Sequence, residues 1–206
     1  MEINQATEHL QVIRTLMERA ALYRRTLAPI MLCIGTLGLL ASAGGIVLGI
    51  EKTRTFCEWW LAGALVALTS AFLIARRQAF RDREPFWSPP TRRVTQALLP
   101  PLAAGFFFSL ALVILNPGNM HWLFLFPNIF FYGCAMHAAG FFMPRGMKLF
   151  GWLIIVLAGF ASLVLLLVRK DLNPRQAHVL MGVFFGFLHL GYGVYLRLTE
   201  VHRNET

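Results

Sequence analysis

Two histidines have surroundings that could support chemistry, because each lies in a long apolar stretch beside glycines. His137 follows Gly133 by four residues and precedes Gly140 by three, so on a helix the three residues share one face. His189 lies in a similar stripe, whose glycines are Gly182, Gly186 and Gly193. A glycine stripe lets another helix or a flat ligand approach an imidazole closely. Such a pair could hold a b-type haem or a metal ion, or hydrogen-bond neighbouring helices.

Further polar side chains lie at a comparable depth in the apolar stretches. At 1.5 Å per residue, His137 and His189 lie roughly 10–12 Å inside the boundaries marked by Pro144 and Arg197. The other members of this candidate layer are Thr69, Ser70, Asn128 and Tyr132. Polar groups inside a bilayer are costly and face the interior of a helix bundle. We therefore expect a polar layer in which His137 and His189 are neighbours.

Three interpretations of this layer are open. In the first, the imidazoles are neutral and hydrogen-bond neighbouring helices, an interaction of about 0.6 kcal/mol on average. In the second, the layer lines a path for a small molecule or an ion. In the third, His137 and His189 are axial ligands of haem b, or share a metal. The stretches carry no deep Asp, Glu, Lys or Arg for the relay of an ion-coupled pump, and no common catalytic motif.

The composition places the whole chain in a membrane. Of its 206 residues 57% are hydrophobic and only 14% are charged, with a mean hydropathy of +0.59, whereas soluble domains carry about a quarter charged residues. Six apolar stretches are long enough to cross a bilayer as helices. They cover residues 27–50, 57–75, 95–115, 122–143, 149–168 and 177–196. The expected fold is an all-α polytopic membrane protein forming a single domain over residues 1–206.

An amphipathic helix is expected before the first of these stretches. Over residues 4–25, Leu10, Ile13 and Met17 recur at helical spacing, and charged residues lie largely elsewhere. Such a helix could lie on the membrane surface, or pack against a partner or a second copy.

The basic residues are distributed unevenly between the two sides of the predicted bundle. Fourteen of the 19 lysines and arginines fall on the side that holds both termini and residues 76–94. Because positively charged segments stay in the cytoplasm, we expect an inner (plasma) membrane protein with cytoplasmic termini. The net charge of +9 is then explained by topology and anionic lipid, and nucleic-acid binding is rejected.

The polar segment 76–94 is the largest connection in the chain. Asp82 and Glu84 only partly balance its arginines, and Pro85 is expected to end the preceding helix. Ser88 and Thr91 are both candidate caps of the next helix, and Pro89 is suited to its first turn. We predict contacts with lipid headgroups for Arg76, Arg77, Arg81, Arg83, Arg92 and Arg93.

Small residues predict where helices approach closely. Ala41, Gly45 and Gly49 are spaced four apart in the first stretch, which is typical of close helix packing. The complete set of glycines predicted to pack against other helices is Gly45, Gly49, Gly133, Gly140, Gly182, Gly186 and Gly193. The three cysteines have no metal-binding spacing.

These features favour a non-enzymatic protein, either permease-like or an accessory membrane subunit that acts as a homo-oligomer or with a partner. A haem-binding redox protein is the alternative from a different class. A membrane-embedded enzyme acting on lipid or isoprenoid groups is a weaker alternative. The substrate and the partner are not encoded in any motif.

Overall fold

The computed structural model describes residues 26–83, 85–116, 118, 121–143, 145–168 and 172–204. Within these ranges the chain is helical, without strands, and six helices are long and apolar enough to cross a membrane. The prediction of six spanning helices is therefore confirmed. The amphipathic helix predicted over residues 4–25 lies outside the described residues.

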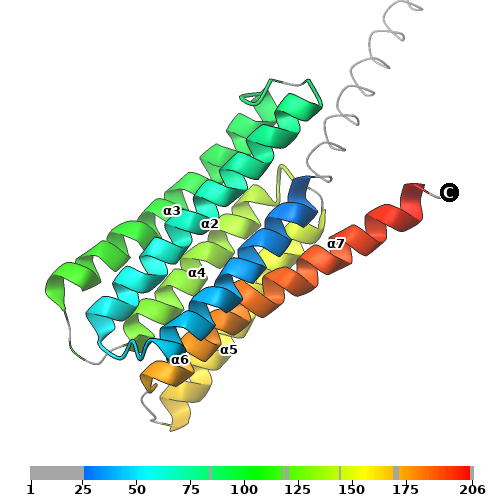
Figure 1. Cartoon of the computed structure of the whole chain (residues 1–206). Helices are drawn as coiled ribbons and strands as arrows, with labels where there is room; N and C mark the ends of the chain where they lie inside the picture. Colours follow the sequence, from blue (N-terminus) through cyan, green and yellow to red (C-terminus); the bar gives the residue numbers. More distant parts are fainter. Residues whose placement is uncertain are drawn as a thin grey trace, which may run out of the picture.

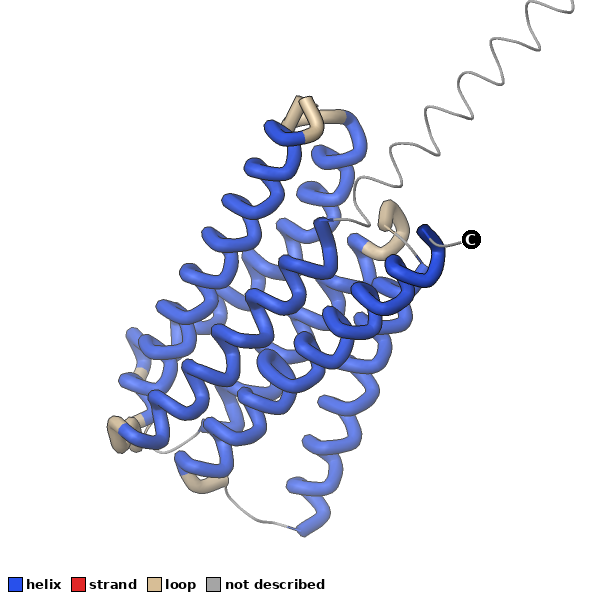
Figure 2. The backbone as a smooth tube through the Cα atoms, turned by 45° about the vertical axis from the view of Figure 1, so that its right-hand side comes forward, coloured by secondary structure: helices blue, strands red, loops and turns tan. Residues whose placement is uncertain are grey.

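The helices run roughly along one direction and are joined by short turns (Figures 1 and 2). The first spans Thr26–Val47. The others are α2 (Thr53–Arg81), α3 (Pro89–Leu115), α4 (His121–Ala139), α5 (Arg145–Val168), α6 (Pro174–Met181), the π-helical segment η1 (Gly182–Phe187) and α7 (Leu188–Asn204). The last three follow without a break, and Pro174–Thr199 is the sixth spanning helix.

Local sequence explains several helix ends. Gly49 has φ +63°, and bonds from the amides of Gly49 and Ile50 to the carbonyls of Ile46 and Gly45 close the first helix. Gly49 has no neighbour within 4 Å of a Cβ position, so its predicted role in helix packing is wrong. It is a helix cap, because only glycine adopts this backbone conformation without strain.

The α2–α3 hairpin is longer than the predicted spans. The sequence indicated spans of 57–75 and 95–115, but the helices run over Thr53–Arg81 and Pro89–Leu115. As expected, α2 ends before Pro85 and Ser88 occupies the N-cap position of α3. The turn between α2 and α3 lies at one end of the bundle, which we call the arginine-rich end (Figure 1).

Glycines line two tight interfaces of the bundle. In the first, α4 packs on α5, where Gly133 of α4 faces Ile154 and Gly140, directly after α4, faces Lys148. In the second, the first helix runs antiparallel to the last. Along this interface Leu32 lies against Gly193, Leu39 against Gly186, Ser42 against Gly182, and Gly45 against His178. The described glycines of the predicted set other than Gly49 therefore lie against neighbouring helices.

Large apolar side chains cover much of the outer surface. Leu40 is 62% exposed, Phe107 is 65% exposed and Leu166 is 74% exposed. An apolar surface of this extent is typical of proteins surrounded by lipid, and water-soluble proteins rarely expose one. The chain is therefore a multi-pass membrane protein.

Candidate functional site

A hydrogen bond between Tyr132 and His189 joins α4 to α7 in the bundle interior. The Tyr132 hydroxyl lies 2.6 Å from Nε2 of His189, and Nδ1 of His189 lies 2.9 Å from the carbonyl oxygen of Phe184. A carbonyl can only accept, so Nδ1 carries the proton and Nε2 accepts from the Tyr132 hydroxyl. The imidazole, fully buried, is therefore neutral with both nitrogens satisfied.

The π-helical segment η1 positions His189. In this segment the amide of Leu188 donates to the carbonyl of Val183, five residues earlier. The ring of His189 bonds the carbonyl of Phe184, which is also five residues earlier. A π turn leaves a backbone carbonyl in need of a partner, and the histidine ring supplies one.

His137 lies apart from this pair. Its ring makes edge contacts with Phe141 and Trp152, each with ring centroids 5.3 Å apart, on the α4–α5 side. The ring contacts of His189 are with Tyr132, Phe150 and Phe185. The expected neighbour relation between His137 and His189 is therefore wrong. Tyr132 and His137 are five residues apart, and on a helix this spacing turns the two side chains about 140° from each other.

This geometry does not favour haem ligation by the two histidines. An axial ligand must present a free ring nitrogen to iron. Both nitrogens of His189 are engaged in hydrogen bonds. Nδ1 of His137 has no described partner, but its ring lies against Phe141 and Trp152, apart from His189. Binding haem through Nε2 of His189 would require breaking its hydrogen bond to Tyr132, while the bond from Nδ1 to Phe184 could remain.

The remaining residues of the predicted layer fall into separate groups. Asn128 accepts a 2.9 Å hydrogen bond from the buried hydroxyl of Ser109, which joins α3 to α4. Thr69 is exposed and donates to the carbonyl of Leu65 in its own helix, and Ser70 on the same helix is half-buried. The prediction that Thr69 faces the bundle interior is wrong, because a back-bonded hydroxyl needs no partner there.

A second polar cluster lies at the end of the bundle opposite the arginine-rich end, and it was not predicted from the sequence. His121 and His178 are each 1% exposed. Nε2 of His121 lies 2.8 Å from the carbonyl oxygen of Glu51, and Nε2 of His178 lies 3.2 Å from that of Ile50. The Phe56 ring contacts both imidazoles, with centroid distances of 5.2 and 4.7 Å. We call these residues the histidine clasp, since they hold the turn between the first two helices.

Both ring nitrogens and the backbone carbonyl of His178 are hydrogen-bonded. The indole of Trp60 donates to its Nδ1 at 3.2 Å, and the hydroxyl of Ser42 donates to its backbone carbonyl at 2.8 Å. A Cβ at Gly45 would overlap its ring. Because Nδ1 accepts from Trp60, the proton is on Nε2 and the imidazole is neutral. The sequence contained a signal for the clasp, since both histidines lie at the same ends of their apolar stretches.

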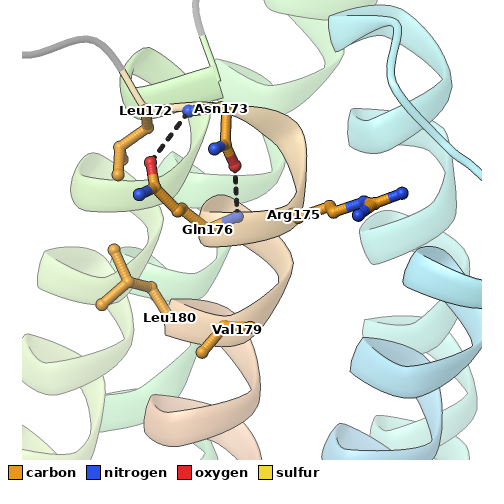
Figure 3. Close-up of a pocket in the computed structure, with 6 residues that line it drawn as sticks. All are labelled: Leu172, Asn173, Arg175, Gln176, Val179 and Leu180. Carbon is orange, nitrogen blue, oxygen red and sulfur yellow. Dashed lines mark hydrogen bonds between the residues drawn. The ribbon is translucent and has the colours of Figure 1, made fainter.

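An open pocket lies beside the start of α6, and none of the polar groups described above lines it. It is lined by Leu172, Asn173, Arg175, Gln176, Val179 and Leu180. Asn173 and Gln176 form a capping box with hydrogen bonds of 2.8 and 3.2 Å, and Arg175 points away from the apolar residues (Figure 3). The polar groups thus cap a helix and do not converge on a ligand.

Known proteins give no further indication of function. Comparisons with protein-family models, with characterised proteins and with solved structures find no match to this chain. Among the described residues no group of three histidine, cysteine, aspartate or glutamate side chains could hold a metal ion. The functional argument therefore rests on the helices and their surfaces.

Proposed function

We propose that this chain is a non-enzymatic accessory subunit of the inner membrane, in which α2 packs against a partner membrane protein or a second copy. Three pairs of polar side chains bond one helix to another, namely Tyr132 with His189, Ser109 with Asn128, and Trp60 with His178. This arrangement favours a structural role over the permease-like path that the sequence also allowed. The exposure of α2 carries the proposal.

The middle of α2 has little contact with the rest of the chain. Its buried residues are confined to the two ends, namely Thr53, Phe56, Cys57 and Trp60 at one end and Ala79 at the other. Over 61–78 no residue is buried, and α2 is the least buried of the six spanning helices. Its surface combines large residues such as Leu65 and Leu68 with small ones such as Ala62 and Ala64. Surfaces of this kind permit close helix association in membranes.

Photocrosslinking from α2 tests this role. A benzoylphenylalanine at Leu65, which is 56% exposed, should crosslink to a protein in native membranes. The matched control is the same residue at Val156 of α5, which is 58% exposed and likewise in the middle of its helix. Differently tagged copies of the chain distinguish a second copy from another protein. If both positions crosslink to lipid alone, the accessory role is wrong.

The orientation is part of the proposal. The bias of basic residues supports cytoplasmic termini and a cytoplasmic arginine-rich end. A single cysteine introduced at position 84 should react with a membrane-impermeant maleimide only after the cytoplasmic side is opened. A cysteine at position 118 should react in intact cells. The reverse pattern of labelling would invert the topology.

A further inference from the structure

The α2–α3 hairpin presents a strongly basic surface at the arginine-rich end. Its exposed arginines are Arg76, Arg77, Arg81, Arg83, Arg92 and Arg93. We propose that the four nearest the apolar parts of the two helices, Arg76, Arg77, Arg92 and Arg93, form a binding site for the headgroups of anionic phospholipids.

The arginines of the two helices lie at about the same level. Arg77 lies four residues before the end of α2 at Arg81, and Arg93 lies four residues after the start of α3 at Pro89. At 1.5 Å per residue, each is about 6 Å along its helix from the connecting turn. The two helices are antiparallel neighbours in both views (Figures 1 and 2). Arginines of both helices therefore lie at the level of one layer of headgroups.

This level coincides with the edge of the hydrocarbon layer. On the exposed face of α2, Phe72 is 48% exposed and Leu73 is 55% exposed, and the arginines follow one turn later. On α3 the surface becomes apolar again at Leu99, which is 62% exposed. The 29 residues of α2 span about 43 Å, whereas the hydrocarbon core is about 30 Å thick. The arginine-bearing turns thus lie among the headgroups.

The positive charge of the hairpin is not neutralised by its described residues. Among the described residues of the hairpin turn the acidic one is Asp82, and its carboxylate accepts a 3.0 Å hydrogen bond from Gln78. The ion pair found in the described part of the chain joins Arg54 to Glu58, at the opposite end. Exposed guanidinium groups with no acidic partner among the described residues are suited to phosphate, which they bind in a bidentate manner.

Aromatic side chains between the arginines favour a lipid over a soluble acidic protein. Phe86 of the turn packs edge-on against Phe72, with centroids 5.1 Å apart, which holds the turn close to the lipid-facing side of α2. Phe80 is 68% exposed, with the guanidinium of Arg76 over its ring at 5.4 Å, and Trp87 is 60% exposed. Exposed aromatic rings at this depth are typical of the membrane interface.

Native mass spectrometry of lipids retained by the purified chain tests the site. The protein is reconstituted in nanodiscs of equal parts phosphatidylcholine and phosphatidylglycerol, then released into detergent. The wild type should retain phosphatidylglycerol preferentially. In the double variant Arg77→Gln/Arg93→Gln the preference should fall about 30-fold, from roughly 1 kcal/mol per arginine. The matched control, Arg54→Gln/Arg175→Gln, removes two exposed arginines at the other end and should leave the preference unchanged.

Each other outcome contradicts the proposal. Equal retention by the wild type and the Arg77/Arg93 variant would exclude a specific site. An equal fall in the control would show that net charge, and not this surface, attracts the lipid. Binding of a polyglutamate peptide in phosphatidylcholine nanodiscs, without a preference for phosphatidylglycerol, would instead assign the surface to an acidic protein. Size-exclusion profiles identify any variant that has lost its fold.

Discussion

Replacing Gly38 by alanine should destabilise the bundle by about 2–3 kcal/mol, although it adds a single methyl group. A Cβ at this position would overlap the backbone carbonyl of Phe185 and lie 2.8 Å from the amide nitrogen of Gly186. Backbone atoms cannot rotate away as a side chain would, so the two helices must separate. Thermal unfolding in detergent, followed by fluorescence, measures the effect.

Gly191→Ala is the matched control for this substitution. Gly191 lies on the partner helix of the same interface, but a Cβ there would have no atom within 4 Å. The control should be neutral, or stabilising by up to about 1 kcal/mol because alanine favours helix. Equal losses of stability in the two variants would show that the first and last helices are not in close backbone contact at Gly38.

Replacing His178 by alanine should destabilise the bundle by about 3–5 kcal/mol, more than the added methyl group at Gly38. The change empties a fully buried position and leaves the indole N–H of Trp60 and the carbonyl of Ile50 without their partner. Hydrogen exchange should also accelerate in the turn at residues 48–52, which the ring holds in place. Both the melting temperature and the exchange rates of this turn report the outcome.

His137→Ala is the control for the loss of an imidazole. The described contacts of His137 are ring contacts with Phe141 and Trp152, and its Nδ1 has no hydrogen-bond partner. Its removal should cost no more than about 1 kcal/mol and should not alter exchange at residues 48–52. If His137→Ala were as damaging as His178→Ala, the clasp would not be the group that fixes the turn.

The spanning helices and their packing faces could be predicted from the sequence. Hydropathy and helical periodicity located all six spanning helices, because a bilayer requires long apolar helices and little else. They also indicated the glycine faces, where small residues recur at i and i+4. The ends of α2 and α3 at the turn between them were also predictable. Both helices continue beyond the apolar stretches because arginine is a good helix former, and Pro85 prevents α2 from continuing further.

The grouping of polar residues was not predictable in the same way. Equal depth suggested that His137 and His189 meet, but depth leaves the direction of a side chain around the helix axis undefined. The π turn at Gly182–Phe187 changes that direction for His189, and periodicity calculated for an ideal α-helix cannot include it. His121 and His178 were overlooked because residues at the ends of apolar stretches usually face headgroups. Here the turn at residues 48–52 folds over them.

The pairing of the first helix with the last has a consequence for how the chain is made. Ser42 and His178 are hydrogen-bonded across 136 positions of sequence. At about 5–20 residues per second, a ribosome needs on the order of ten seconds or more to add that length. During this interval the first helix is already synthesised, with its Gly35 and Gly38 face uncovered. The first helix therefore lacks its partner on this face until the final helix emerges.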